Sequence, residues 1–295
     1  MSFAYYTERQ QLALEALAEY RFLTVKQMVR LKIGKSETSI RDNILAPLYS
    51  RYRAPINKQD VGKFLGASYV WSLTAKGARD LAEFWEVPED KVPFPKGGVQ
   101  FSTQYWHRIA QIDFHIAVNQ WAETIGAEIV LKARDYIKTL ENNRAPETKI
   151  IFDDGNFIIP DGVFGIRFQG KLFLYALEIH HADSTERITA KLKNYFKALV
   201  EKKISERWNY DLACYVLSVY QEQDLCTDTK LTRSQRQSKN LEFCRNKMEY
   251  VKQRLLSDSE FERFKPGFYF NSMDQVRSDL TTGWTLADDI AVTPF

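Results

Sequence analysis

The sequence predicts an α+β chain in two parts, a small, mainly helical domain followed by a larger domain that mixes helices with strands. Three observations support this. Apolar residues recur at helical spacing through the first 50 residues, a proline- and glycine-rich boundary follows, and helical stretches then alternate with short apolar runs of strand composition. We therefore expect a domain over residues 1–86, a linker over 87–103 and a second domain over 104–295.

Composition excludes several classes of protein. The chain has 295 residues, 44% of them hydrophobic, which is typical of globular domains. It contains no apolar run as long as a membrane span, and its N-terminus lacks the pattern of a secretory signal. Cys214, Cys226 and Cys244 have neither zinc-type spacing nor an even count. We expect a cytoplasmic protein with reduced thiols and no membrane partner.

Positive charge is concentrated in the first domain. Residues 1–80 carry 13 Lys/Arg and 7 Asp/Glu, a net charge of +6, whereas the whole chain has only +3. The remainder is therefore slightly acidic, at −3. A basic N-terminal domain followed by a slightly acidic remainder favours a nucleic-acid-binding domain joined to a second domain with a different function.

The first domain has the order helix, helix, turn, helix. Residues 7–20 have apolar helical spacing, and Thr24 is a predicted N-cap for a short helix over 25–31. Gly34 supplies a tight turn, and Ser36 is a predicted cap for a third helix. The inner face of that helix comprises Ile40, Ile44 and Leu48, and Pro47 is expected to end or kink it. This order is the helix-turn-helix layout.

Residues 69–78 predict a strand that runs into a capped helix. They resemble the last wing strand and closing helix of winged helix-turn-helix regulators, with residues 54–68 as the wing. The exposed face of the third helix carries Thr38, Ser39 and Asp42, which distinguish DNA bases poorly, and the Asp42 carboxylate also repels phosphate. A helical adaptor that binds no DNA stays open as the alternative. The predicted DNA-binding residues are Lys32, Lys35, Ser36, Thr38, Ser39, Arg41, Lys58 and Lys63.

The second domain has the predicted order helix, three strands, helix, strand, which is the αβββαβ order of the restriction-endonuclease-like fold. Two hairpin turns, Asp153-Asp154-Gly155 and Gln169-Gly170, separate the strands. The predicted helices cover 105–123 and 184–205, and the strands cover 128–138, 156–169, 171–180 and 210–220. A basic, Ser/Gln-rich segment at 230–239, a helix over 241–256 and a strand over 267–270 follow.

Two acids on neighbouring predicted strands are the candidate catalytic groups. Asp161 lies in one apolar run and Glu178 ends another, and paired carboxylates are typical ligands of Mg²⁺ or Mn²⁺. Their flanks resemble the PD-(D/E)xK nuclease core, but His180 stands where that motif has lysine. Lys191 lies at the edge of an apolar helix face, from which it either reaches the acids or snorkels to solvent.

Asp113 falls within the inward face of the helix over 105–123, beside Ile109 and Ile112. A buried acid needs a metal or a partner, so Asp113 is either a third metal ligand or a carboxylate bonded to the backbone or to Arg108 and its neighbours. His180 and His181 point to opposite faces of their strand, and His107 and His115 lie on the side of their helix away from Ile109. A zinc site built from the histidines is therefore not favoured, and His180 is expected to accept or donate a hydrogen bond or to contact phosphate.

Several short motifs together resemble the replication-relaxation family of plasmids, integrative elements and phages. They are Trp71-Ser72-Leu73-Thr74-x-x-Gly77, His107 with Asp113, Pro160-Asp161, Leu177-Glu178-Ile179, and Lys191-x-x-x-Tyr195. The family typically has an acid after Glu-Ile, where this chain has His180. The resemblance covers roughly residues 5–220.

The resemblance implies a DNA-binding accessory or regulatory protein in replication, relaxation or mobilisation. Its implied partners are duplex DNA and a relaxase or replication protein, and a homodimer is left open. Because lysine is missing from the strand, we expect a nuclease-like domain without full catalysis. The alternatives are an active Mg²⁺-dependent endonuclease using Asp161, Glu178 and Lys191, and a protein-interaction subunit that docks a relaxase.

Overall fold

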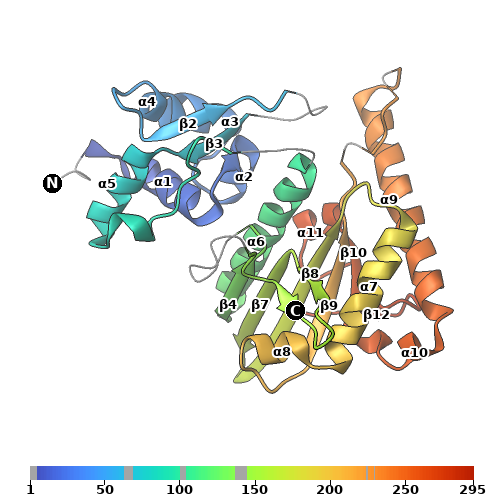
Figure 1. Cartoon of the computed structure of the whole chain (residues 1–295). Coiled ribbons are helices and arrows are strands. Elements are labelled where there is room, and N and C mark those ends of the chain that lie inside the picture. Colours follow the sequence, from blue (N-terminus) through green and yellow to red (C-terminus); the bar gives the residue numbers. More distant parts are fainter. Residues whose placement is uncertain (1–4, 63–68, 100–103, 137–144, 224, 229) are drawn as a thin grey trace. The chain divides into compact units, whose positions relative to one another are not determined.

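The computed structural model describes residues 5–62, 69–99, 104–136, 145–223, 225–228 and 230–295. The chain divides into two compact units, Met1–Tyr105 and Trp106–Phe295 (Figure 1). Helices and a large mixed sheet are both present, which confirms the α+β class. Of the helices in these ranges, none has the length and apolarity needed to cross a membrane.

The first unit packs its helices around a three-stranded sheet. Strand β3 lies between β1 and β2 and is antiparallel to both, with Leu23 opposite Trp71 and Lys58 also opposite Trp71. Thr7 and Thr24 form capping boxes at the starts of the first two helices. The elements are α1 (Glu8–Tyr20), β1 (Leu23–Thr24), α2 (Val25–Arg30), α3 (Glu37–Ile40), a π-helical turn (Arg41–Leu45), α4 (Ala46–Tyr49), β2 (Ile56–Gln59), β3 (Val70–Leu73), α5 (Ala75–Trp85) and a 3₁₀ turn (Glu89–Lys91).

The third helical segment runs without a break from Ser36 to Tyr49. Ser36 caps it as predicted, and the expected inner residues Ile40, Ile44 and Leu48 are buried. Pro47 does not end it, because the chain widens into the π-helical turn just before the proline. A proline clashes with the carbonyl four residues earlier, and a π turn relieves that clash.

The segment expected to be a linker contacts the first unit. Val92 is buried, and the side chain of Gln59 on β2 hydrogen-bonds both backbone groups of Val99. The described part of residues 87–103 therefore extends the first unit, and the division between the units falls at Tyr105.

The second unit is built on one seven-stranded sheet in the order β12-β11-β10-β9-β8-β7-β4. The neighbours β4, β7 and β8 are antiparallel, whereas β8, β9 and β10 are parallel. Its elements are α6 (Tyr105–Ile125), β4 (Glu128–Arg134), β5 (Ile150–Ile151), β6 (Phe157–Ile158), β7 (Gly162–Phe168), β8 (Lys171–His180), α7 (Thr185–Val200), α8 (Lys203–Arg207), β9 (Cys214–Tyr220), α9 (Arg233–Leu256), α10 (Ser259–Glu262), a 3₁₀ turn (Lys265–Gly267), β10 (Phe268–Ser272), α11 (Met273–Ser278), β11 (Trp284–Thr285) and β12 (Ala291–Val292).

Helices cover both faces of this sheet (Figure 1). Helices α7 and α9 pack on one face, where Leu192 and Val251 join a core with Ala176 and Val216 of the strands. Helices α6 and α11 pack on the other face. Because successive strand residues point to opposite faces, β8 is buried throughout most of its length.

Three predicted elements differ from the structure. The strand expected over 156–169 is split into β6 and β7, because Pro160 between them has no N–H to donate to a ladder. The helix expected over 241–256 begins earlier, at Arg233, where Thr232 supplies a capping box. The helix expected over 184–205 is divided into α7 and α8, with Lys202 in the left-handed conformation between them. The strand expected over 267–270 is present as β10, and β11 and β12 lengthen the sheet beyond it.

Candidate functional site

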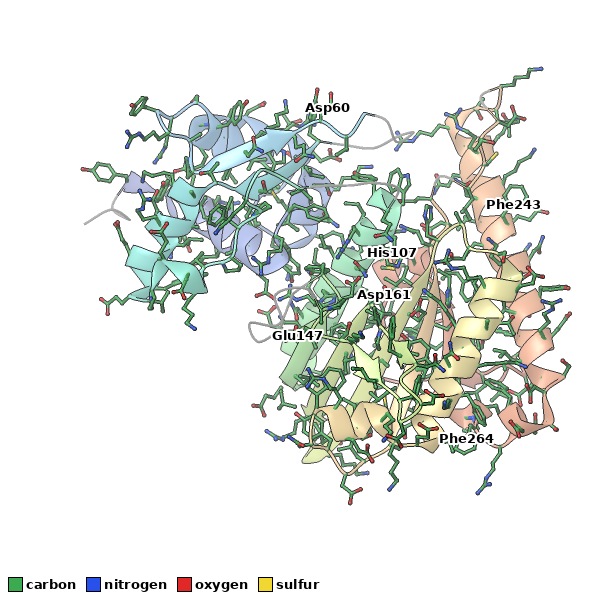
Figure 2. The ribbon with its side chains drawn as sticks, in the orientation of Figure 1. Asp60, His107, Glu147, Asp161, Phe243 and Phe264 are labelled. Atoms are coloured by element: carbon green, nitrogen blue, oxygen red, sulfur yellow. The ribbon has the colours of Figure 1, made fainter. Side chains whose placement is uncertain are left out.

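Polar side chains gather at one end of the large sheet. Strands β4 and β8 end there and β7 begins there, because β7 is antiparallel to both. This placement brings Asp135, which follows β4, close to Asp161, which precedes β7, and to Glu178 near the end of β8. We call these three residues the carboxylate cluster. Figure 2 labels Asp161 and His107 at this end of the sheet.

Asp161 is buried and each of its oxygens accepts hydrogen bonds. Oδ1 accepts from Gln111 Nε2 at 3.0 Å, and Oδ2 accepts from the backbone N–H of Ile179 at 2.6 Å. The His107 ring nitrogen Nε2 lies 3.1 Å from Oδ2. The backbone N–H of Asp161 also donates to Leu177 at 2.9 Å, which fixes the carboxylate against the neighbouring strand.

Glu178 is only 1% exposed and is held by helix α7. Its Oε1 pairs with the Lys191 ammonium, and its Oε2 accepts a hydrogen bond from the Tyr195 hydroxyl at 2.8 Å. Lys191 and Tyr195 are four residues apart and so lie on the same side of α7. The lysine that was expected either to reach inward or to snorkel therefore reaches the acid.

Asp135 was not among the predicted site residues. Its Oδ1 accepts from Gln111 Nε2 at 3.1 Å and from Arg108 at 3.3 Å. The single amide nitrogen of Gln111 thus bridges Asp135 and Asp161. His107 and Gln111 are four residues apart on α6 and so lie on the same side of it, and this spacing is the sequence signal that could have indicated this part of the site.

The pKa values of the three acids in the carboxylate cluster are shifted in different directions. Burial and the nearby charge of Asp161 raise the pKa of Glu178 to about 7, against the opposing effects of Lys191 and Tyr195. Burial raises the pKa of Asp135 to about 6, although Arg108 opposes it. Burial acts on Asp161 in the same direction, but His107 and Lys191 outweigh it and leave its pKa below the usual value. Asp161 is therefore ionised throughout the neutral range, whereas Asp135 is mostly ionised and Glu178 only partly ionised at pH 7.

His107 is the cationic partner of Asp161. Burial lowers its pKa, but the charge of Asp161 and their hydrogen bond outweigh burial and raise the pKa to about 8. The imidazole is therefore mostly protonated at pH 7. Lysine and histidine cations thus face the two central acids from α7 and α6, respectively.

His180 does not supply positive charge. It is buried, its Nε2 lies 3.0 Å from Ser218 Oγ, and its ring packs against Tyr220 with the centroids 4.8 Å apart. Burial and the Lys191 charge lower its pKa to about 3. His180 shares a face with Glu178 as expected, but it is a neutral hydrogen-bonding side chain with no access to a bound phosphate.

Asp113, expected either as a metal ligand or as a paired acid, is paired. Its Oδ2 accepts from Arg277 Nε of α11 at 2.7 Å, and the same guanidinium also contacts Glu222 and Gln221. The assignment of Asp113 to a metal site with Asp161 is therefore corrected. The partner is an arginine 164 residues away in sequence, which no local pattern indicates.

The carboxylate cluster does not fit Mg²⁺ or Mn²⁺ as it is arranged. All four oxygens of Asp161 and Glu178 already accept from protein donors, two of which are cationic. In the part of the chain that the structure describes, no group of three or more His, Cys, Asp or Glu side chains could hold a metal ion. Hard cations need free oxygen ligands, so no step through a metal follows from this geometry.

The residues predicted to bind DNA lie on the surface of the first unit. Lys32, Lys35, Thr38 and Arg41 are exposed around the third helical segment. Arg41 lies 3.8 Å from Glu37, and both side chains are about half exposed, so this ion pair is weak. Ser36 is engaged as the helix cap, and the backbone N–H of Ser39 donates to it at 3.2 Å.

Lys58 projects from β2 beside aromatic rings. Its ammonium lies 3.9 Å from the ring centre of Tyr69 and 5.7 Å from that of Trp71. Tyr49 packs edge-on against Trp71 with the centroids 5.9 Å apart. Lys58 remains exposed and is available to an anion. Lys63 lies outside the described residues.

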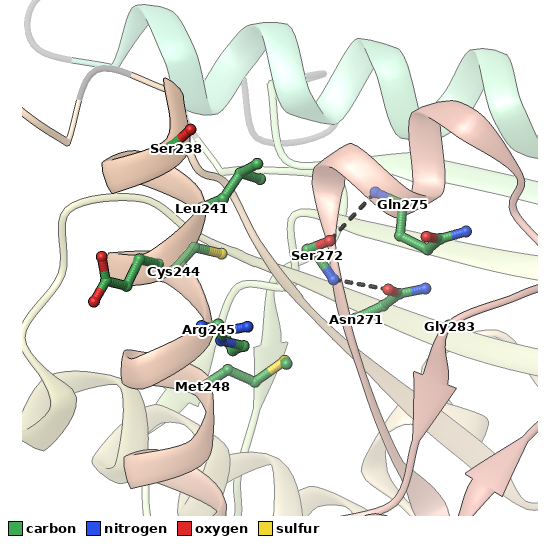
Figure 3. A pocket seen from close by; sticks show the side chains of 10 residues that line it. Ser238, Leu241, Cys244, Arg245, Met248, Asn271, Ser272, Gln275 and Gly283 are labelled. Carbon is green, nitrogen blue, oxygen red and sulfur yellow. Dashed lines mark hydrogen bonds between the residues drawn. The ribbon is translucent and has the colours of Figure 1, made fainter. Parts of the chain in front are cut away.

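A pocket lies between α9 and the β10–α11 junction (Figure 3). Leu241, Cys244 and Met248 line it from α9, and Asn271 and Gln275 line it from the other side. None of the carboxylate-cluster residues lines it. Its amide groups are already bonded, since Asn271 contacts the Thr282 carbonyl and Gln275 contacts the Thr282 hydroxyl.

Comparisons of the chain with protein-family models, with curated proteins and with solved structures gave no match.

Proposed function

We propose that this chain is a DNA-binding protein whose first unit binds duplex DNA as a winged helix-turn-helix domain. The observation that carries the proposal is the third helical segment. One of its faces is buried through Ile40, Ile44 and Leu48, and exposed Lys35 and Arg41 flank its start. An exposed helix flanked by basic residues suits the DNA major groove and its phosphates.

The sheet of this unit supports the same proposal. Strands β2 and β3 form an antiparallel pair beside the third segment, and Lys58 is exposed on β2. In the proposed domain this hairpin is the wing, and Lys58 contacts a phosphate. Thr38 and Asp42 on the exposed helix face are weak base readers, so we expect sequence preference to be modest.

The test measures the affinity of the full chain for labelled duplex DNA over a range of salt concentrations. The Lys35→Gln/Arg41→Gln variant should bind more weakly, and its log affinity against log salt should lose about 0.9 in slope per lost contact. Arg79→Gln/Lys91→Gln is the matched control, because it removes two exposed positive charges of the same unit that lie outside the third helical segment, one on α5 and one in the 3₁₀ turn after it. Equal effects of the two variants would refute the proposal.

For the second unit we propose a nuclease-like scaffold with little or no cleavage activity. The support is the pairing of Asp161 with His107 and of Glu178 with Lys191, which leaves the acids without free oxygens. His180, in the position of the motif lysine, is neutral and cannot stabilise developing phosphate charge.

An active Mg²⁺-dependent endonuclease is the second candidate, favoured by the convergence of Asp161, Glu178 and Lys191 at one end of the sheet. Incubation with supercoiled, linear and single-stranded DNA in Mg²⁺ or Mn²⁺ separates the two. Nicking that disappears in both Asp161→Asn and Lys191→Met would establish the enzyme. On the resemblance to replication-relaxation proteins, we propose that either activity serves a mobile element, with a relaxase or replication protein as partner.

A further inference from the structure

The first turns of α9 carry charged side chains, and none of their residues is buried against the rest of the unit. All residues of α9 are described, and none before Cys244 is buried. In Figure 1 these turns extend beyond the ends of the neighbouring strands. Before Cys244, Ser238 and Leu241 line the pocket shared with β10 and α11, and the Oδ1 of Asn240 accepts a hydrogen bond from the Cys226 N–H at 2.5 Å. Most protein helices are stabilised by tertiary packing, so this protruding part needs another explanation.

The charged side chains at this end of α9 and just before it are all positive. Lys230, Arg233, Arg236 and Lys239 are the only charged residues between Thr229 and Leu241. Within the described residues, no ion pair or hydrogen bond is present at the side chains of these four, and only Arg236 is half-buried. Some other exposed basic residues of the unit, such as Lys193 and Arg254, pair with acids, whereas Lys171, Arg207 and Arg263 are exposed at separate positions rather than gathered on one helix.

The position of this charge is unfavourable for the helix itself. The start of a helix is the positive end of its dipole, so Arg233 and Arg236 in the first turn of α9 are unfavourable for the helix. The first turn of α9 contains no acidic residue that would offset this. A sequence that breaks a local rule at several neighbouring positions indicates a functional constraint.

We infer that Lys230, Arg233, Arg236 and Lys239 form a second DNA-binding surface, which we call the α9 basic stripe. Its partner is the phosphate backbone of duplex DNA. Phosphates supply the complementary charge, and Ser234, Gln235, Gln237 and Ser238 between the basic residues offer further donors to phosphate oxygens. The inference rests on the proposed DNA binding of the chain and adds a contact in the second unit.

The test uses the full chain and a labelled duplex, with affinity measured at about 50 to 200 mM salt. The Arg233→Gln/Arg236→Gln/Lys239→Gln variant should weaken binding about tenfold or more at the lower salt. The slope of log affinity against log salt should fall by roughly two to three. Arg and Gln have similar helix propensities, so the fold should be retained.

Lys171→Gln/Arg207→Gln/Arg263→Gln is the matched control, since it removes the same charge from three exposed positions of the second unit. Equal weakening by both variants would overturn the inference, because only net charge would then matter. So would an unchanged affinity of the stripe variant. Binding of poly-L-glutamate that is lost in the stripe variant while DNA binding stays intact would also overturn it, and would indicate an acidic protein partner.

The Lys35→Gln/Arg41→Gln variant separates this inference from the proposed function. If that variant weakens DNA binding and the stripe variant does not, the inference fails and the proposed function stands. If the stripe variant alone weakens binding, the first unit is not the DNA-binding domain and the stripe is confirmed as a contact.

Discussion

Replacing Lys191 by methionine should destabilise the second unit in a pH-dependent way. The change keeps a long side chain in place but leaves Glu178, which is 1% exposed, with only the Tyr195 hydroxyl as a partner. Removing one partner of a buried ion pair costs about 3–5 kcal/mol. Lys191 is itself 37% exposed, so solvent already screens the pair, and we reduce the expected loss to about 2–3 kcal/mol.

The sign of the pH dependence follows from Glu178. Its folded-state pKa is raised from 4.5 to about 7, so this carboxyl stabilises the fold fully below about 4.5 and loses that contribution as pH rises through 7. Without Lys191 the pKa rises by about two further units for a loss of 2–3 kcal/mol. The variant should therefore match wild type near pH 5, where Glu178 is protonated, and fall below it near pH 8.5.

Urea unfolding followed by circular dichroism measures this loss. With a slope of about 2 kcal/mol per molar, the midpoint should shift by about 1 M near pH 8.5 and by much less near pH 5. Lys193→Met is the control, because Lys193 lies on the same helix, is 50% exposed and pairs with Asp258. It should change stability by less than about 1 kcal/mol at either pH. Adding Glu178→Gln to Lys191→Met should restore stability at the higher pH. Equal losses at both pH values would refute the buried-pair reasoning.

Three further outcomes are expected. Gly77→Ala should destabilise the first unit by about 1–3 kcal/mol, since a Cβ there would lie 2.1 Å from the Pro55 carbonyl oxygen; an unchanged melting temperature would contradict that close approach. Ser218→Ala should cost about 1–3 kcal/mol in urea unfolding, because it removes the partner of buried His180 Nε2; a neutral result would mean that another group satisfies the ring. In imidazole NMR spectra His107 should titrate near pH 8 and His180 should stay neutral down to about pH 4, and a His107 midpoint at or below 6.5 would argue against its pairing with Asp161. Because the His107 pKa is raised, its contribution to stability is complete below 6.5 and is lost as pH rises through 8.

Local signals in the sequence predicted much of the first unit. Thr24 and Ser36 cap helices where their side chains were expected to do so. Gly77 is explained by the structure, since Thr74 caps α5 at that glycine and the Pro55 carbonyl lies against it. The helix caps depend on residues within a few positions of each other, which is the range over which a sequence pattern is informative, whereas the approach of Pro55 to Gly77 depends on the fold.

Side-chain partners in the second unit depend on the fold and were only partly predicted. Alternation along β8 placed Glu178 and His180 on one face, and helical spacing placed Lys191 at the edge of α7. Strand register cannot be obtained from spacing alone, so the approach of Asp135 to Asp161 was missed. His107 was placed on the side away from the core, but α6 is buried around most of its circumference. For a helix covered on several sides, a single apolar face does not identify which polar residues point inward.

Two groups of charged residues in this chain differ in burial, and burial decides how strongly salt affects their interactions. Those of the carboxylate cluster are buried and balanced, with His107 and Lys191 facing Asp161 and Glu178. Salt screens such pairs weakly, so the stability that they give should change little between low and high ionic strength. The basic residues of the third helical segment and of the α9 basic stripe are exposed and mostly unopposed, so their attraction for a polyanion falls steeply with salt. A chain whose DNA affinity responds strongly to salt while its folding stability does not is therefore the combined expectation of both groups. DNA affinity that is insensitive to salt would contradict phosphate contacts by these exposed basic residues.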